Sequence, residues 1–404
     1  MRLLYFHQHF STPSGAVGQR SYAMARRFIE YGHTVTIVCG SYKGGVTGLT
    51  DPFVKGCRRG NVDGIQVIEF DLSYANHDSF IKRFWTFMKF AFRSVKLVFT
   101  LDYDVIFAST TPLTVGIPGI LGRWLRRKPF VFEVRDLWPE LPKAMGVITN
   151  PLILGCLSLL ERVSYHSAHE LIALSPGMCD GIVRCGIPKE KVHLVSNGCD
   201  LHIFENVKPS SRPLGVADTD LMAVYAGTHG MANGLDAVLD TAVVLQRRAR
   251  TDIKFVLVGD GKLKQALQQR SREEGLDNVL FLELLPKRTL AELMLAADIG
   301  LQILANVPAF YDGTSPNKFF DYIAAGLPVL INYPGWLGKK VIESQCGFVV
   351  PPNDADAFAD TLEKAAADRS SLKQMGKNAR QLAEQEFDRN ELAEQWVNVI
   401  ETCV

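Results

Sequence analysis

The sequence of 404 residues lacks an excess of charge of either sign. Lysine and arginine together number 44 and aspartate and glutamate 43, so the formal net charge is +1. Because nucleic-acid-binding domains usually carry a basic excess, we expect no nucleic-acid partner. Long apolar runs are also missing. None reaches the roughly 18 residues that indicate a membrane-spanning helix, so we expect no such helix.

The sequence is equally poor in metal-binding and disulfide motifs. None of its eight cysteines belongs to a Cys-x-x-Cys pair, and its nine histidines form neither His-x-x-x-His nor His-Glu-x-x-His. These spacings are the ones that place ligands around zinc, so a zinc site is not indicated. We interpret the scattered cysteines as reduced thiols of a cytoplasmic protein, and we expect neither a metal nor another cofactor.

What the sequence does have is a regular alternation of two patterns. Short β-branched and aromatic runs alternate with longer stretches of helical periodicity, which is typical of parallel α/β units. In the first half we expect strands at Leu3–His7, Thr34–Cys39, Ile65–Phe70, Asp104–Ala108, Phe130–Val134, Glu170–Leu174 and Val192–Val195. In the second half we expect them at Leu221–Ala226, Ile253–Val258, Val279–Leu282, Ile299–Ile303, Pro328–Ile331 and Gly347–Val350. The pattern therefore predicts two doubly wound, Rossmann-like domains.

A polar, proline-containing segment without periodicity, residues 206–219, separates the two halves and is typical of an interdomain linker. We expect an N-terminal domain at 1–205, a C-terminal domain at 220–385, and a helix at 386–404 that can pack back on the first domain. Open α/β sheets bind ligands at the carboxyl ends of their strands. Two such domains, facing each other across a cleft, would bind one ligand each.

The most informative stretch is 313–329, where a helix is expected to begin. Ser315 is a good N-cap and Pro316 suits the first helical position. The free N–H groups of a first helical turn attract anions, and Lys318 adds a positive charge there. Asp321 lies on nearly the same helix face and can accept both hydroxyls of a ribose. The alternative is an ordinary capped helix with a Lys–Asp ion pair.

Three glycine-rich turns follow expected strands. They are Gly227–Gly234, Gly259-Asp260-Gly261 and the N-terminal loop Ser14–Arg20. Such a turn lets the backbone approach a phosphate closely, although a plain turn is the alternative for each. The second turn does not extend to Gly-x-Gly-x-x-Gly, so a dinucleotide fingerprint is not supported.

In this order the motifs resemble those of glycosyltransferase family 4, the retaining sugar-nucleotide enzymes of GT-B fold, over essentially the whole chain. Further stretches in family order are Gly32–Val35, Ser196–Asp200, Pro316–Val329 and Gly347–Asp354. Phe132–Pro139, Ala226–Gly234 and Ser315–Lys318 are most similar to the branch that contains the bacterial L-fucosamine (N-acetylfucosamine) transferases of surface polysaccharide synthesis.

The resemblance implies a retaining, metal-independent glycosyltransferase. It would move a sugar, an N-acetylated deoxyhexosamine, from a UDP-sugar to a polyprenyl-diphosphate-linked glycan in O-antigen or capsule synthesis. The first domain would bind the acceptor and the second the donor. The donor-binding residues that it implies are Gly15, Gly18, Thr228, His229, Gly230, Asn233, Gly259, Asp260, Leu285, Ser315, Pro316, Asn317, Lys318 and Asp321.

For catalysis, the resemblance implies that Lys318 stabilises the leaving diphosphate. Arg135 or Asp136, directly after an expected strand, would position the acceptor, and the alternative for these two is a structural salt bridge. Attack of the acceptor would occur on the front face, with a diphosphate oxygen receiving its proton.

The chain departs from the family at two places. Relatives carry two spaced acidic residues, and the first position falls on Gly313 here, with Asp312 one residue away. Thr228 and Asn233 stand where many members have Arg and Lys. We infer that Lys318 and the amides around it carry more of the diphosphate charge. The rival hypotheses are a nucleotide-sugar epimerase of the same fold and a non-catalytic scaffold of polysaccharide assembly.

The segment Ser79–Thr100 raises the question of a membrane. It contains five cations and no acid, and its cations recur at helical spacing on an otherwise apolar pattern. Such a helix fits the interface of an anionic membrane, on the inner face of the plasma membrane. The alternative is a helix buried against the sheet with only its basic stripe wet. The candidate membrane or acceptor residues are Phe84, Trp85, Lys89, Arg93, Trp124, Arg126 and Arg127.

Overall fold

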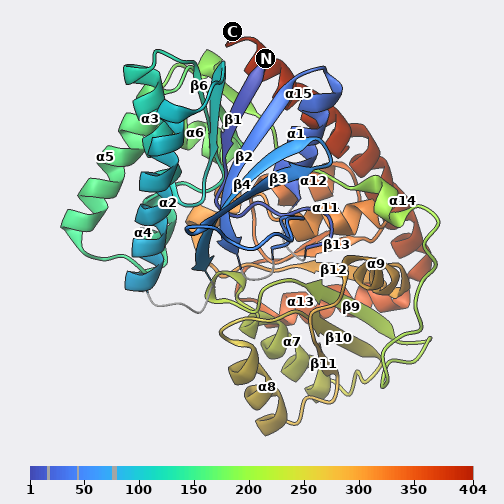
Figure 1. Ribbon diagram of the computed structural model, residues 1–404. Coiled ribbons are helices and arrows are strands. Elements are labelled where there is room, and N and C mark those ends of the chain that lie inside the picture. The colour runs from blue at the N-terminus through green and yellow to red at the C-terminus, as the bar shows by residue number, and fades with distance from the viewer. Residues whose placement is uncertain (16–18, 43–44, 75–79, 404) are drawn as a thin grey trace. The chain divides into compact units, whose positions relative to one another are not determined.

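The computed structural model describes residues 1–15, 19–42, 45–74 and 80–403, and it divides into two compact units (Figure 1). Unit 1 comprises Met1–Asn197, Asp312–Ser315 and Asn390–Val404. Unit 2 comprises Gly198–Tyr311 and Pro316–Arg389. Each unit is an α/β fold around its own sheet, which is mostly parallel in unit 1 and parallel in unit 2.

The sheet of unit 1 has the strand order β3-β4-β2-β1-β5-β6-β7-β8. Its neighbouring strands pair in parallel, apart from the antiparallel pair of β3 and β4. The strands are β1 Arg2–Phe6, β2 Thr34–Tyr42, β3 Cys57–Val62, β4 Ile65–Tyr74, β5 Val105–Ser109, β6 Phe130–Val134, β7 Glu170–Ala173 and β8 Val192–Leu194.

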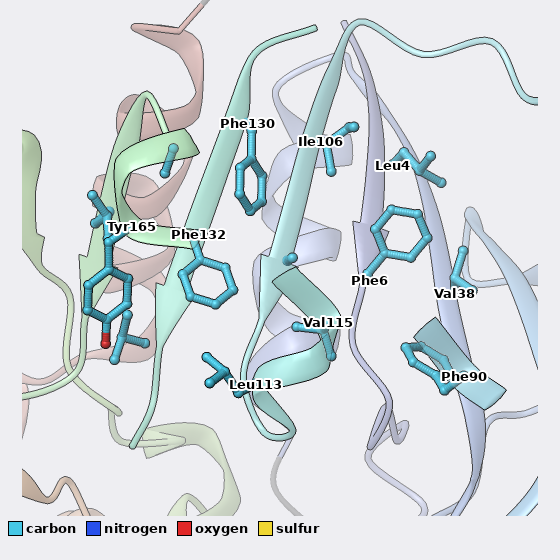
Figure 2. Close-up of a cluster of buried hydrophobic side chains, with 14 of the residues drawn as sticks. Leu4, Phe6, Val38, Phe90, Ile106, Leu113, Val115, Phe130, Phe132 and Tyr165 are labelled. Carbon is cyan, nitrogen blue, oxygen red and sulfur yellow. The ribbon is translucent and has the colours of Figure 1, made fainter. Parts of the chain in front are cut away.

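Helices cover both faces of this sheet, because successive strand side chains point to opposite faces and both sets are apolar. Leu4 and Phe6 join the buried cluster drawn in Figure 2, which also contains side chains of α2, α5 and α6. Leu3 and Tyr5 join the opposite cluster, with α1 and α15. The helices are α1 Arg20–Glu30, α2 Phe80–Thr100, α3 Gly116–Leu125, α4 Glu140–Ala144, α5 Pro151–Ser167, α6 Pro176–Arg184 and α15 Arg389–Glu401.

The sheet of unit 2 is parallel, with the strand order β11-β10-β9-β12-β13-β14. Its strands are β9 Leu221–Ala226, β10 Ile253–Val258, β11 Val279–Leu282, β12 Ile299–Gln302, β13 Val329–Ile331 and β14 Gly347–Val349. The remaining helices are α7 Asp236–Arg247, α8 Lys264–Glu273, α9 Lys287–Ala296, α10 Pro308–Gly313, α11 Asn317–Ala324, α12 Trp336–Glu343, α13 Ala355–Ala367 and α14 Arg369–Glu386. Side chains of α7 and α13 pack on one face of the sheet.

The predicted class, two Rossmann-like α/β domains, is confirmed, and the expected strands occur within a few residues of their predicted bounds. Strand β3 was not among the predicted strands, because its sequence Cys-Arg-Arg-Gly-Asn-Val lacks apolar alternation. It pairs with β4 through a tight turn in which Asp63 and Gly64 both have positive φ. An Asp-Gly pair is the signal of such a hairpin.

The chain passes from unit 1 to unit 2 at Asn197–Gly198, earlier than the expected boundary, and residues 206–219 belong to unit 2. The physical reason is a buried ion pair within unit 2. Arg389 Nε donates to Asp200 Oδ1 at 2.5 Å and Arg389 Nη2 donates to Gly198 O at 2.6 Å. Lys287 Nζ also donates to Asp200 at 2.8 Å. These contacts tie the start of unit 2 to its last residue.

Unit 1 has a buried ion pair near the carboxyl ends of its strands. The guanidinium of Arg20, in the first turn of α1, lies 2.8 Å from the carboxylate of Glu133 on β6, and both side chains are almost inaccessible to solvent. Arg20 also donates to the main-chain oxygens of Val195 and Ser196, and Ser109 Oγ donates to Glu133 at 2.6 Å. A charge pair at this depth is tolerated because every member is paired.

Replacing Glu133 with Gln should destabilise unit 1 by about 3–5 kcal/mol, because Arg20 would remain as a buried charge without a partner. Urea unfolding followed by circular dichroism measures the loss. The control is Asp102→Asn, which removes an acid from the exposed ion-pair group around Arg2 and should change little. Equal effects of the two substitutions would contradict the assignment.

Candidate functional site

Two glycine turns of unit 2 pack backbone against backbone at the carboxyl ends of β9 and β10. A Cβ on Gly259 would lie 2.0 Å from Gly227 O, and one on Gly261 would lie 2.5 Å from His229 O. The His229 amide donates to Asp260 O at 2.9 Å, which joins the two turns. Only glycine permits this approach, so the sequence fixes the path of the Gly227–Gly234 loop through the next strand's turn.

Lys264, at the start of α8, stabilises the Gly259–Gly261 turn through hydrogen bonds of its ammonium group. Its buried Nζ donates to Gly259 O at 2.8 Å, to Leu282 O at 3.1 Å and to Glu283 Oε1 at 2.8 Å. The residues that end β10 and β11 are therefore held together by one ammonium group. Lys264 could not be found from the sequence, because a lysine after a glycine turn resembles an ordinary exposed helix residue until its burial is known.

Lys318 lies in the first turn of α11 and reaches the Gly227–Gly234 loop. Its Nζ donates to Asn233 Oδ1 at 2.8 Å and lies 4.7 Å from the centre of the Tyr225 ring. A Cβ on Gly227 would come within 3.0 Å of Lys318 Cε. The helix itself is anchored by Tyr322, whose hydroxyl accepts from the Ala226 amide at the end of β9 at 2.9 Å.

The expected full positive charge on Lys318 requires correction. The side chain is half-buried, and burial lowers its pKa to about 7. Among the described residues no carboxylate lies within ion-pair distance of Nζ, so nothing there favours the charged form. An anion at this position would restore the proton, because an opposite charge raises the pKa of an amine.

Asp321, one turn further along α11, is half-buried, and within the described chain its carboxylate has no hydrogen-bond partner. Burial raises its pKa to about 6; Lys287 and Arg389 oppose that shift and Asp200 adds to it. In the described chain it forms no ion pair with Lys318, so the alternative of a simple Lys–Asp pair is wrong. A carboxylate that lacks a partner and is partly shielded from water is a candidate acceptor for ligand hydroxyls.

The expected start of this helix is wrong by one residue. Pro316 is the N-cap and Asn317, which is exposed, is the first helical residue. Ser315 belongs to unit 1, where its Oγ accepts from the Asn197 amide at 3.3 Å and its main-chain oxygen accepts from Asn197 Nδ2 at 2.6 Å. The serine hydroxyl is therefore engaged elsewhere and does not cap α11.

The expected contribution of His229 also requires correction. Its side chain is completely buried, and burial lowers its pKa to about 4. Neither ring nitrogen has a partner among the described residues. The ring therefore supplies no positive charge, and only the backbone of His229 shapes the turn. Of the other predicted donor residues, Thr228 and Asp260 are exposed, Gly230 and Leu285 are half-buried and Gly259 is buried.

In unit 1, polar residues follow the carboxyl ends of β1 and β6. Arg135 Nη1 donates to His7 Nε2 at 3.1 Å, and His7 Nδ1 lies 2.9 Å from Ser21 Oγ. Burial lowers the pKa of His7 well below its usual range, and the charge of Arg135 lowers it further. The neutral ring thus accepts from Arg135 and donates to Ser21. His7 could not be found from the sequence, because the expected strand Leu3–His7 includes it, whereas β1 ends at Phe6.

Asp136 and Arg135 do not form the structural salt bridge that was the alternative. Asp136 Oδ2 instead accepts from Thr111 Oγ1 at 2.8 Å, and burial raises its pKa. The N-terminal loop is only partly described: Gly15 is buried, and Gly18 lies outside the described residues. Arg20, at the end of that loop, is held in its buried ion pair with Glu133.

Helix α2 lies beside α3 in unit 1 (Figure 1). It buries one face, which includes Phe87 and Phe90. The alternative, a helix that exposes only its basic stripe to solvent, is wrong, because large apolar side chains are exposed too. The exposed apolar residues of α2 and α3 are Ile81, Phe84, Trp85, Phe92, Phe99, Trp124 and Leu125.

The cations of this surface differ in their contacts. Arg93 stacks at 5.6 Å over the Phe70 ring, and Arg126 donates to Val98 O at 3.0 Å. Lys89 and Arg127 are exposed. No helix in the described ranges combines the length and the apolar character needed to cross a membrane. Those ranges also contain no cluster of three or more His, Cys, Asp or Glu side chains suited to a metal ion.

Two family models match the chain. The model described as "Glycosyl transferase 4-like domain" matches residues 15–198, and the model described as "Glycosyl transferases group 1" matches residues 207–382. Among curated relatives, the capsular polysaccharide biosynthesis glycosyltransferase CapM of Staphylococcus aureus is 22% identical over 72% of this chain and 75% of its own. The putative colanic acid biosynthesis glycosyl transferase WcaI of Escherichia coli is 24% identical, and the match spans only 59% of either chain.

Solved structures of the same fold include WaaG, a glycosyltransferase involved in lipopolysaccharide biosynthesis. It is 17% identical, with a TM-score of 0.70 over 99% of both chains. The Anabaena protein HepE in complex with UDP is 17% identical, with a TM-score of 0.66 over the whole of both chains. The chain therefore belongs to the glycosyltransferases, and it carries a glycosyl transferase 4-like domain followed by a glycosyl transferases group 1 domain.

Proposed function

We propose that the protein is a retaining glycosyltransferase that moves a sugar from a UDP-sugar to a lipid-linked glycan. The observation that carries the proposal is the setting of Lys318. Its amine lies at the start of a helix, beside a glycine loop. Among the described residues no carboxylate forms an ion pair with it, and its pKa is lowered to about 7. An amine in this setting can pair with an anionic ligand, and a diphosphate is such a ligand.

Unit 2 would bind the donor. Lys318 and Asn233 would contact the diphosphate, together with amides of the Gly227–Gly234 loop. Asp321 would accept hydrogen bonds from the ribose hydroxyls. As the bond to the sugar breaks, negative charge grows on the diphosphate, and a protonated Lys318 stabilises that charge. This arrangement needs no metal, which is why metal independence is part of the proposal.

Retention of configuration without a carboxylate nucleophile implies attack on the front face. The acceptor hydroxyl would form its bond to the anomeric carbon as the bond to the diphosphate oxygen breaks, and that oxygen would receive the hydroxyl proton. Unit 1 would hold the acceptor, with Asp136 and Arg135 as the positioning residues.

The identity of the substrates is supported by relatives. HepE has been solved with UDP, which favours a uridine nucleotide. CapM and WcaI are named for capsule and colanic acid synthesis, which favours a surface glycan as acceptor. We propose an N-acetylated deoxyhexosamine as the transferred sugar, from the resemblance to the fucosamine transferases. The exposed apolar and basic side chains of α2 and α3 suit a peripheral position on the inner membrane face.

Lys318→Ala should weaken binding of UDP-sugars at least tenfold, because the loop loses its cation, and Asp321→Asn should weaken it severalfold. Calorimetric titration without added metal measures both. Lys373→Ala, which removes an exposed lysine of α14, is the matched control and should bind like the unchanged protein. If no uridine nucleotide binds the unchanged protein, the proposed donor class fails.

Binding of UDP-glucose should weaken as the pH rises above about 7, because the free protein must then take up a proton on Lys318 before it holds the anion. It should also weaken below about 6, because Asp321 becomes protonated. A diphosphate diester does not titrate in this range, so the profile reports protein groups. Lys318→Arg should remove the alkaline decline, since guanidinium stays charged. A flat profile between pH 5 and 8.5 would contradict the assignment.

Vesicles with anionic lipid should sediment the protein, and vesicles of neutral lipid should not. Phe84→Ser combined with Trp85→Ser should reduce the bound fraction severalfold, because both side chains are exposed on α2. Leu214→Ser, an exposed apolar residue of unit 2, is the control. Equal sedimentation of all variants would exclude α2 as the contact.

A further inference from the structure

Two arginines lie near the carboxyl ends of the strands of unit 1, and they differ in whether a carboxylate pairs with them. Arg20 pairs with Glu133 at 2.8 Å and spends its other N–H groups on the main-chain oxygens of Val195 and Ser196. It is buried and fully satisfied, and therefore has nothing left to offer a ligand.

Arg135 is half-buried, and its side chain has one hydrogen-bond partner within the described ranges, the neutral ring of His7 at 3.1 Å. None of the described carboxylates lies within ion-pair distance of it. Its Nε and Nη2 groups have no hydrogen-bond partner in the described ranges and are accessible to solvent. A guanidinium in this state keeps most of its fork-shaped donor set for a carboxylate or phosphate.

The surroundings hold Arg135 in place without cancelling its charge. Thr110 Oγ1 accepts from the Arg135 amide at 2.8 Å, which fixes the backbone. Ser21 fixes the ring of His7, which in turn orients Nη1 of Arg135. Asp136, the adjacent acid, takes its hydrogen bond from Thr111.

The charge of Arg135 acts on the side chains around it, and it opposes the rise that burial causes in the pKa of Asp136. The charge of Arg135 lowers the pKa of His7 and, after burial, that of His9 as well; the His9 pKa falls to about 4. Arg83 of α2 acts on His9 in the same direction. Both histidines therefore stay neutral and add no charge of their own, and the guanidinium of Arg135 favours an anionic group over a cationic one.

We propose that Arg135 is the centre of an anion subsite in unit 1 that binds a phosphate or carboxylate group of the acceptor. The inference rests on the proposed function in so far as the anion belongs to a glycan acceptor. A phosphate would come from the lipid-linked end of the acceptor and a carboxylate from an acidic sugar. The shared chemistry is bidentate recognition of a planar or tetrahedral oxyanion by guanidinium.

The test is calorimetric titration of inorganic pyrophosphate and of glucuronate, at low ionic strength. It is done in the Lys318→Ala background, so that the lysine of unit 2 cannot bind the probe. Arg135→Gln should weaken binding of the preferred anion at least tenfold, and Arg135→Lys should recover part of it. Arg59→Gln, which removes an exposed arginine of β3, is the matched control and should change nothing.

Preference for pyrophosphate assigns the subsite to a phosphate of the acceptor, and preference for glucuronate assigns it to an acidic sugar. Binding that is equal in Arg135→Gln and its parent, or absent from both, overturns the inference. If Lys318→Ala fails to fold, the same titrations are done on the otherwise unchanged protein saturated with UDP. Failure of UDP to bind at all is a separate result, because it contradicts the proposed donor, while the anion titrations in the Lys318→Ala background still test Arg135.

Discussion

The close backbone approach of Gly227 and Gly259 is the constraint on which the candidate donor site depends. A side chain on Gly259 would lie 2.0 Å from the Gly227 carbonyl oxygen, so neither turn can take another path while the strands stay paired. Lys264 closes the arrangement by binding the main-chain oxygens at the ends of β10 and β11. These contacts hold the loop after β9 in one path. Tyr322 anchors α11, and α11 places Lys318 beside that loop. A preorganised loop and a delivered amine are what stabilisation of a leaving anion requires.

Both units use a buried cation, and the contrast between paired and unpaired cations separates structural from functional roles. Arg20 and Arg389 are buried against Glu133 and Asp200, and these pairs hold the fold together. Lys318 and Arg135 are half-buried and have neutral partners, Asn233 and His7. Withholding a counter-charge has a cost in the free protein, because burial disfavours the charged form, and for Lys318 it lowers the pKa to about 7. That cost is recovered when an anion binds, which makes these two positions the candidates for ligand contact.

Much of the fold could be predicted from the sequence, because buried parallel strands are continuous apolar runs and glycine marks their turns. Phe130–Val134 and Leu221–Ala226 have the bounds that the pattern predicts. Strand β3 could not be found in this way, since its polar edge sequence carries no alternation. Within the site, Lys318 and Asp321 were identified by helix spacing, which depends only on local geometry.

What the spacing could not give was depth and long-range partners. The burial that lowers the pKa of Lys318 comes from the packing of α11 on the loop after β9, far away in sequence. Ser315 looked like a helix cap, yet its hydroxyl accepts from Asn197, a residue distant in the chain. His229 looked like a ligand contact, yet its ring is completely buried and its main chain lies against Gly261. Local pattern fixes elements, whereas charge state and accessibility are decided by tertiary contacts.

We propose that Lys318 gains its proton when the donor diphosphate binds. Titration of a UDP-sugar at pH 8 in two buffers of different ionisation enthalpy measures the protons taken up on binding. With a pKa of about 7 in the free protein, Lys318 is mostly neutral at that pH. We expect uptake of nearly one proton per donor bound, and we expect Lys318→Ala to abolish it. Binding with no proton uptake would contradict it.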